Sequence, residues 1–566
     1  MVIKQEGIEP IVSTLVNHLD GTAKDLHPFR VVASTRVVLS QQVKPATIII
    51  STITGKIVAI LGSVVPSSRF SGIPYYDYSP DVIMPGLVDA HVHLNEPGRT
   101  HWEGFYTGTQ AAAAGGVTTV VDMPLNAIPP TTTVANLEKK IQAAEGKCWV
   151  DVGFYGGIIP GNEHELKDLI RHGVRGFKAF LIDSGVDEFP AIREDDMAKA
   201  MTLLADEPTT LLFHAEMETA DTDACAVTAH ADLPAGGHGN CDVIREYQNF
   251  LDGRPPALEL QAIESIIAKA HLAPNLPLHI VHLSSADAIP LLREARSRGL
   301  KVTAETCSHY LALAAEEVRT GDTRYKCCPP IRERSNQDRL WHELLQAGSR
   351  SVIQTVVSDH SPCTPDLKRL PQHLYDSSSK AVSDGKQGNL NTTVDRRDGD
   401  FATAWGGISS VGMTLSTLWT ELTRRELNSS PEVANRSIIN IVHWCCEQTA
   451  LQVGLEQSKG AIRVGMDADL CIFDDTATWT VKPSGMLFRN KVSPYQGRVM
   501  NGIVRETWLR GQRVFVRDGL NKGFIQGCCA GKLLLEPRTH RDGVKQEAKT
   551  TAMTSERRRS MIGVAC

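Results

Sequence analysis

The stretch that decides the fold of this chain reads Met84-Pro85-Gly86-Leu87-Val88-Asp89-Ala90-His91-Val92-His93. It is an apolar run, typical of a β-strand, that ends in two histidines one residue apart. A His-x-His pair alone is weak evidence for a metal site, because such pairs also occur in surface loops. A second stretch, residues 357–362, places Asp359 and His360 after another apolar run. The residues between the two stretches decide whether both belong to one site.

Between these stretches, apolar runs alternate with helix-like patterns. The runs are Leu87–His91, Val117–Asp122, Val150–Tyr155, Arg175–Phe180, Thr210–His214, Leu278–His282, Lys301–Thr306 and Ile353–Ser358. Helical periodicity marks Val134–Glu145, Glu163–His172, Arg193–Asp206, Ala257–Ala270, Ala286–Arg298 and Gln337–Gln346. Strands that alternate with helices in this way predict an α/β fold, a (β/α)8 barrel of the TIM type.

The flanks of the barrel have a different character. Short β-rich runs occupy residues 30–84, and the same pattern returns in residues 461–519. We therefore predict that both flanks pair into one small β-rich domain beside a barrel of residues 85–460. Residues 1–29 form an extension without an assigned fold. A polar stretch at about 375–400 reads as a mobile insertion, and residues 520–566 as a polar, disordered tail.

The composition is that of a globular protein, with 42% hydrophobic and 22% charged residues. Because 59 basic and 65 acidic residues give a net charge of −6, no nucleic-acid or membrane partner is predicted. The N-terminus lacks the apolar core of a secretory signal. The thirteen cysteines include no Cys-x-x-Cys pattern, which favours reduced thiols. A cytoplasmic location is expected, with the peroxisome as the alternative.

Functional residues in such barrels gather at the C-terminal ends of the strands. The ionisable residues at the ends of the predicted strands are His91, His93, Lys178, His214, His282 and Asp359. A single histidine at a strand end is more often structural. Four histidines that reach the same rim independently are hard to explain by chance, so the set predicts a metal site.

Lys178 is the exception in this set, because an ammonium group repels metal cations. Its apolar neighbours in residues 176–181 would lower the pKa of the amine. A neutral amine can add carbon dioxide and become a carbamate, an anion whose two oxygens can bridge two metal ions. The alternative interpretation is an aliphatic stem that carries its charge to the rim.

This set resembles that of the cyclic amidohydrolase family, which contains dihydroorotases, hydantoinases, dihydropyrimidinases and allantoinases. The resemblance extends from about residue 30 to residue 519 and implies a centre of two divalent metal ions, with zinc as the first candidate. It implies that carbon dioxide converts the lysine to N6-carboxylysine, which bridges the ions. It also implies a homo-oligomer, commonly a tetramer. The implied ligands are the pair His91 and His93, the bridging Lys178, the second-metal histidines His214 and His282, and Asp359, which is also the acid–base catalyst.

Several motifs narrow the subgroup. Asn95 stands where a dihydroorotase is expected to carry an arginine, and Asp183 where a hydantoinase has a tyrosine. Residues 122–126, 180–190, 327–332, 361–365 and 404–410 resemble allantoinase motifs. The resemblance thus implies hydrolysis of the small molecule allantoin to allantoate in purine catabolism. Asn95 and Cys328 are the candidate substrate contacts, and Glu216 is a candidate for orienting a metal ligand.

Two other functions are compatible with the sequence. One is a hydantoinase or dihydropyrimidinase that acts on a related cyclic amide. The other is a non-catalytic scaffold, which would keep the barrel but lose metal ligands; the complete ligand set argues against it. Two positions depart from the family pattern: His101 replaces an acidic residue and Ser308 replaces a proline.

Overall fold

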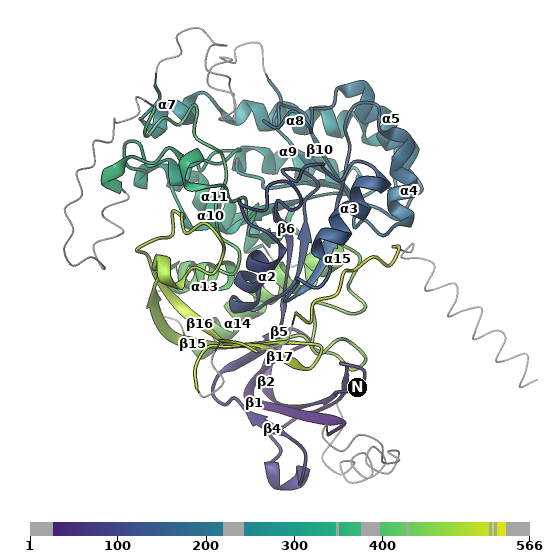
Figure 1. The fold of residues 1–566 in the computed structure, drawn as a ribbon, viewed down its shortest axis with the longest axis vertical. Helices are drawn as coiled ribbons and strands as arrows, with labels where there is room; N and C mark the ends of the chain where they lie inside the picture. Colours follow the sequence, from purple (N-terminus) through teal and green to yellow (C-terminus); the bar gives the residue numbers. More distant parts are fainter. Residues whose placement is uncertain are drawn as a thin grey trace, which may run out of the picture.

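Figure 1 shows the computed structural model of the 566-residue chain. The structure describes residues 27–218, 243–346, 350–374, 397–425, 430–519, 523–525 and 529–538. Most of the predicted N-terminal extension, insertion and tail (residues 1–26, 375–396 and 539–566) lie outside the described residues. No helix within the described ranges combines the length and the apolar character needed to cross a membrane.

The centre of the molecule is a ring of parallel strands. These are β6 (Leu87–Val92), β7 (Val117–Asp122), β8 (Asp151–Phe154), β9 (Gly156–Gly157), β10 (Phe177–Phe180), β11 (Leu211–His214), β12 (Leu278–Ile280), β13 (Val302–Cys307) and β14 (Ile353–Val357). Nearly all their side chains are buried, which explains why they read as continuous apolar runs.

The ring is closed at two places. Tyr155 interrupts a single barrel strand, whose first part, β8, pairs with β7 and whose second part, β9, pairs with β10. The last strand returns to the first through a parallel bridge between Val92 and His360, where the His93 amide donates to the His360 carbonyl at 2.7 Å. The predicted (β/α)8 barrel is therefore confirmed.

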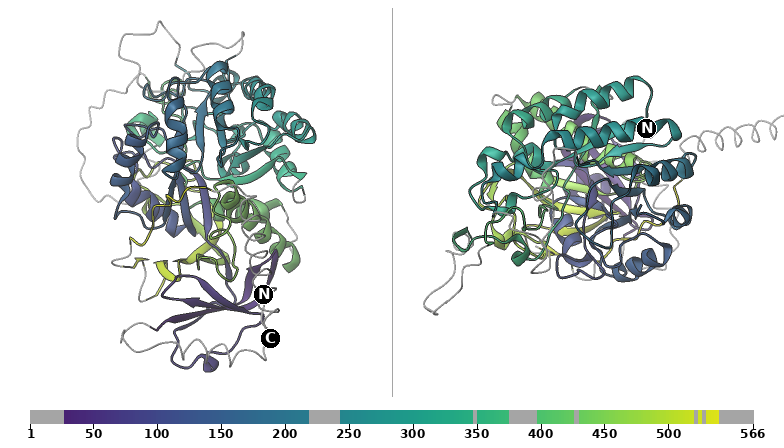
Figure 2. Two further views of the ribbon diagram at one scale, coloured as in Figure 1. Left: turned by 90° about the vertical axis from the view of Figure 1, so that its right-hand side faces the viewer. Right: turned by 90° about the horizontal axis from the view of Figure 1, so that it is seen from above.

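Helices cover the outside of the ring, and they surround the strands when the molecule is seen from above (Figure 2). They are α2 (Phe105–Ala114), α3 (Val134–Ala144), α4 (Leu166–Arg171), α5 (Glu194–Leu204), α7 (Tyr247–Asp252), α8 (Pro256–Lys269), α9 (Ile289–Ser297), α10 (Ser308–Ala312), α11 (Arg334–Leu344), α13 (Thr414–Arg425), α14 (Pro431–Val442) and α15 (Gln448–Gln452). Each of the six helical patterns predicted from the sequence overlaps one of these helices. α3 is typical, because Thr133 caps its first turn and its buried residues recur at helical spacing.

The small sheet at the lower end of Figure 1 contains both flanks of the chain. Its strands are β1 (Phe29–Leu39), β2 (Gln42–Ser51), β3 (Ile57–Leu61), β4 (Tyr75–Asp77), β5 (Val82–Pro85), β15 (Leu470–Thr480), β16 (Val499–Leu509), β17 (Gln512–Val516) and β18 (Gly523–Phe524). The flanks join where β5 pairs antiparallel with β15, with Ile83 opposite Ile472. The prediction that both ends form one sheet is confirmed, and β5 leads directly into β6 and its histidines.

A buried cluster of charged side chains connects this sheet to the barrel through ion pairs. The Lys459 ammonium donates to Asp151, the first residue of β8, and to Asp469 beside β15, each at 2.6 Å. Arg510 also pairs with Asp151. Because each buried carboxylate has a cationic partner, the cluster avoids the large cost of an unpaired buried charge.

Part of the expected polar tail packs on the barrel. Val152 of β8 donates its amide to the Lys532 carbonyl, and Leu534 donates to the Val152 carbonyl, both at 2.8 Å. The expectation of a disordered segment from residue 520 onward is therefore wrong for residues 529–538. The reason is a local apolar run, residues 533–535, within a polar segment; its leucines pack against the barrel core.

Candidate metal and catalytic site

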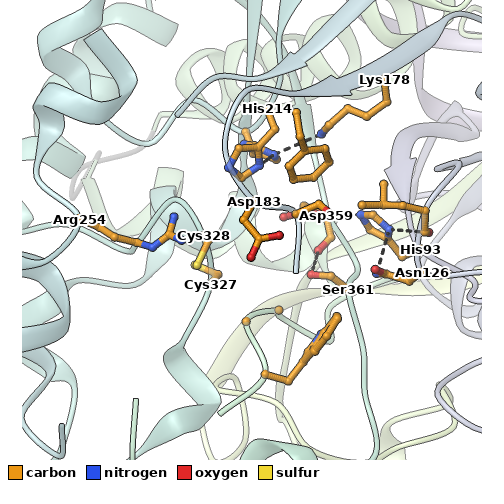
Figure 3. Close-up of a pocket in the computed structure, with 17 residues that line it drawn as sticks. His93, Asn126, Lys178, Asp183, His214, Arg254, Cys327, Cys328, Asp359 and Ser361 are labelled. Atoms are coloured by element: carbon orange, nitrogen blue, oxygen red, sulfur yellow. Dashed lines mark hydrogen bonds and ion pairs between the residues drawn. The ribbon is translucent and has the colours of Figure 1, made fainter. Parts of the chain in front are cut away.

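All six predicted ligands lie at the C-terminal rim of the barrel. His91 and His93 flank the end of β6, Lys178 lies in β10 and His214 ends β11. His282 and Asp359 each follow their strand by two residues. All six side chains are buried, and all except His91 line one pocket (Figure 3). The structure thus brings together residues that are separated by up to 268 positions in the sequence, from His91 to Asp359.

Two of these residues have an uncommon backbone conformation. His282 has a φ of 40° and Asp359 a φ of 44°, both in the left-handed region that non-glycine residues rarely adopt. Such conformations cost on the order of 1–3 kcal/mol and are retained where the surrounding structure fixes them, often at functional sites. Here the turn directs each side chain from the end of its strand into the pocket.

The six side chains form two adjoining groups. In the first, the Asp359 Oδ1 atom lies 3.3 Å from His91 Nε2 and 3.7 Å from His93 Nε2. In the second, His282 Nε2 lies 3.1 Å from His214 Nδ1 and 3.4 Å from Lys178 Nζ. The two groups adjoin at His91 and His282, whose ring centroids lie 5.4 Å apart. The two groups contain the same residues that the sequence resemblance implies as ligands, and their assignment to two metal positions stays a prediction.

The geometry of these residues is compatible with a metal centre, independently of the sequence resemblance. The ligand atoms of His91, His93 and Asp359 all lie within 4.8 Å of one another. Within the part of the chain that the structure describes, the buried ring nitrogens His91 Nε2 and His282 Nδ1 make no hydrogen bond. Buried polar atoms normally have partners, and an ion is one explanation of those that do not. Imidazole and carboxylate are also the donors that zinc prefers.

Carboxylates behind the histidines hold their rings in place. Glu305 contacts His91 Nδ1 at 2.5 Å and His279 Nε2 at 3.1 Å. Burial by itself would raise the pKa of Glu305, but these two rings lower it well below its usual range. Glu216 contacts His214 Nε2 at 2.7 Å and accepts from the buried Arg254 at 2.6 Å. Such carboxylate–histidine pairs fix the ring orientation and strengthen the metal-facing nitrogen as a donor.

Lys178 has the environment of a reactive amine. Its side chain is 1% exposed, and burial lowers its pKa to about 8, against the attraction of Asp359 and Glu305. The ammonium of a typical lysine is almost fully protonated near neutral pH. The neutral amine, the form that adds carbon dioxide, is therefore much more populated at Lys178 than at a surface lysine.

Asp359 lies at a predicted metal-ligand position, and its carboxyl group is suited to accept and release a proton. Burial raises the pKa of its carboxyl group, and the neighbouring His91 partly offsets the effect. A carboxyl group with a raised pKa exchanges protons more readily near neutral pH than an exposed aspartate.

The wall of the pocket contains one of the two predicted substrate contacts. Cys328 lines it together with Asp183, Arg254 and Trp405. Asn95 is not among the lining residues; it is 1% exposed and its amide donates to the Pro362 carbonyl at 3.2 Å. This placement gives Asn95 a part in loop structure.

Three residues of the site have no role in the sequence interpretation. Asn126 lines the pocket with a φ of 67°, and its Nδ2 atom lies 3.3 Å from His93 Nδ1. Residues 122–126, which include Asn126, are a recognisable sequence motif, but the motif does not predict the contact with His93. Glu305 could have been found as an acidic residue inside an apolar strand. Arg254 has no local signal, because its partner Glu216 is 38 residues away.

The two departures from the family pattern lie away from the pocket wall. His101 is exposed and packs edge-on against Trp102, with ring centroids 6.3 Å apart. Ser308 is fully buried at the start of α10. Neither is among the residues that line the pocket.

Residues 82–514 match the model of the Amidohydrolase family. The chain belongs to this family. It is 45% identical to the allantoinase of Saccharomyces cerevisiae over 90% of this chain and 100% of that protein. It is 43% identical to the allantoinase of Streptomyces avermitilis over 86% of this chain and 96% of that protein. Among solved structures, it resembles the L-hydantoinase (dihydropyrimidinase) from Arthrobacter aurescens, with a TM-score of 0.72, 26% identity, and coverage of 89% of this chain and 99% of that one.

Proposed function

We propose that this chain is an allantoinase, which hydrolyses the cyclic amide of allantoin to allantoate. The observation that carries the proposal is the set of six buried metal-ligand candidates at one rim of the barrel, five of which line one pocket, in a chain 45% identical to an allantoinase over that protein's whole length. The hydantoinase alternative has less support, since the D- and L-hydantoinases among the solved structures are 22–26% identical to this chain. The complete ligand set argues against a non-catalytic scaffold.

The metal ligands in this proposal are those predicted from the sequence. His91 and His93 would hold one divalent ion and His214 and His282 the other, with Asp359 as a further ligand. Carboxylated Lys178 would be a ligand of both, and zinc is the first candidate metal. When bound, the ions would supply the activation of a water molecule and the polarisation of a ring carbonyl.

The protein's own residues handle the proton and the substrate. Asp359 accepts a proton from the attacking water and returns it to the ring nitrogen as the amide bond breaks. Its carboxylate lies at the pocket wall beside His91 and His93, and Figure 3 shows Asp359 and His93 in this pocket. The side chains of Cys328 and Asp183 border the space that the rest of the substrate fills. The ring opens without a covalent enzyme intermediate, because the nucleophile is water.

The wider context of this reaction also belongs to the proposal. Allantoin hydrolysis is a step of purine catabolism, and allantoin is the only partner that the mechanism requires. A homotetramer and a cytoplasmic or peroxisomal location stay predictions from the sequence.

Metal removal tests the proposed function. Treatment with a chelator and desalting is expected to lower allantoate formation by about 10³-fold or more, since metal activation contributes several kcal/mol and each 1.36 kcal/mol is tenfold. Zinc added with bicarbonate should restore the rate more fully than zinc in carbon-dioxide-free buffer, because Lys178 must be carboxylated again. Allantoate formation and metal content are measured on the same samples. Full activity in protein shown to be free of metal would refute the metal-dependent mechanism.

A further inference from the structure

Beside the proposed metal centre lies a second group of potential ligands. Cys307 is the last residue of β13, and His309 lies two residues later in α10. The Cys307 Sγ atom, a His309 ring nitrogen and an Asp359 carboxylate oxygen all lie within 4.8 Å of one another. Of these residues only Asp359 belongs to the proposed catalytic site, so Cys307 and His309 have no function in the mechanism.

The imidazole of His309 lacks a well-formed hydrogen bond. The residue is 0% exposed, and neither ring nitrogen makes a hydrogen bond of good geometry within the described part of the chain, although the Ser358 backbone acts on the ring. A buried polar group without a good partner costs on the order of 1–3 kcal/mol, so each such group in a native fold requires an explanation. Burial is the main cause that lowers the pKa of His309 to about 3, and a neutral imidazole is able to bind a metal.

Acidic groups dominate the surroundings of Cys307. The largest electrostatic effects on it come from Asp359, Glu305 and Cys327, while the Lys178 amine also acts on the thiol. Burial and the acidic groups raise the pKa of the thiol, so the free site retains the thiol proton. A metal ion can take the place of that proton, because thiolates coordinated to zinc-like ions are deprotonated.

We propose that Cys307, His309 and Asp359 form an inhibitory site for a thiophilic divalent cation such as Zn²⁺ or Cd²⁺. One thiolate, one imidazole and one carboxylate are a ligand combination suited to such ions, with an open fourth position. Metal–ligand bonds of about 2.0–2.3 Å place tetrahedral ligands roughly 3.3–3.8 Å apart. The ligand atoms, which all lie within 4.8 Å of one another, would have to approach by about 1–1.5 Å at most to reach that spacing. An ion enters through the catalytic pocket, where Asp359 forms part of the wall.

Occupation of this site disables the neighbouring one. Asp359 lies 3.3 Å from His91 and 3.7 Å from His93, so an ion held by Cys307 and His309 competes for its carboxylate and occupies the lone pairs that accept the proton in catalysis. The enzyme is thus inhibited when the metal concentration exceeds what the catalytic centre requires. The inhibition rests on the proposed function, whereas the binding of the third ion does not.

Cadmium titration of the metal-loaded, full-length protein tests the site independently of catalysis. Binding to Cys307 is expected to produce the ultraviolet charge-transfer absorption of a cadmium–thiolate bond and one additional metal equivalent per chain. Cys307→Ser should abolish both signals. His309→Gln should keep the thiol but weaken cadmium binding at least about tenfold, since even the loss of an outer partner weakens metal sites by about 10–100-fold.

Two further variants control for other thiols. Cys445→Ser removes a buried cysteine outside the site and should leave the absorption unchanged. Cys328→Ser removes a thiol of the pocket wall and should also leave it unchanged. Absorption that persists in folded Cys307→Ser, or disappears only in Cys328→Ser, would overturn the proposal. An unchanged affinity in His309→Gln would overturn it as well, even if Cys307→Ser does not fold.

The inhibitory role of the site is tested separately, by enzyme kinetics. Excess zinc should inhibit allantoin hydrolysis by the parent protein, and His309→Gln should require at least about tenfold more zinc for the same inhibition. If the parent protein does not hydrolyse allantoin, the proposed function fails while the cadmium absorption still decides the site. If it hydrolyses allantoin but zinc inhibits both proteins equally, the inhibitory role is refuted.

Discussion

Replacing Lys178 with alanine is expected to reduce kcat for allantoin by about 10³-fold or more, because the loss of the bridging ligand removes metal activation worth several kcal/mol. The same variant should contain less metal than the parent protein. Short-chain carboxylic acids such as acetate or propionate should restore part of the activity, because they return a carboxylate to the cavity left by the side chain. Steady-state allantoate formation with and without the acid measures both effects.

The matched control is Lys139→Ala, which removes an exposed lysine on α3. It should leave kcat, metal content and the response to the acid unchanged. Activity in Lys178→Ala within a factor of three of the control would refute the carbamate role of this lysine. Full metal content together with lost activity and no acid rescue would refute bridging while leaving another catalytic role for the amine.

Asp359→Asn is expected to lower kcat by about 10²–10⁴-fold, the usual contribution of general acid–base catalysis. Asparagine keeps the size of the side chain and one oxygen for a metal, but it cannot accept and return a proton. The effect should therefore appear in kcat more than in KM. Asp366→Asn, at an exposed carboxylate seven residues later, is the control. A variant in which KM rises while kcat is preserved would assign Asp359 to substrate binding instead.

The barrel could be predicted because its strands are buried on both faces. The run Val117–Asp122 is identical to β7, and most other runs agree with their strands to within two residues. The run Leu278–His282 extends too far, because β12 ends at Ile280 and His282 already lies in a left-handed turn. The sequence shows the apolar character of a residue but not this change of backbone direction.

The helices absent from the sequence prediction differ in their signal: α13 and α14 are amphipathic, whereas α2 has no periodic pattern. α2 consists largely of alanine, glycine and threonine, and most of its residues are buried, so it presents no contrast between an apolar and a polar face. Residues 529–538 fall in the predicted tail because residues 520–566 as a whole are basic and polar, although residues 529–538 themselves contain only three charged side chains. Their position depends on backbone pairing with Val152, which is far away in the sequence.

The candidate ligands could be predicted from their positions at strand ends, but their supporting partners could not. Glu305 joins His91 to His279 from a different strand, and Arg254 holds Glu216 behind His214. These contacts depend on the three-dimensional arrangement of strands rather than on any local motif. Asn95 follows the histidine pair closely in sequence and is therefore a candidate for the pocket wall. In the structure Asn126 lines that wall and Asn95 does not.

The most direct test of the central claim is a comparison of kcat/KM for four cyclic amides: allantoin, hydantoin, dihydrouracil and dihydroorotate. All four are measured side by side on one preparation of known metal content. We expect allantoin to have the highest kcat/KM and dihydroorotate to be a poor substrate, because Asn95 occupies the position of the arginine expected to bind its carboxylate. A higher kcat/KM for hydantoin or dihydrouracil would favour the hydantoinase alternative, and a result in which allantoin is the poorest of the four would contradict the proposed function.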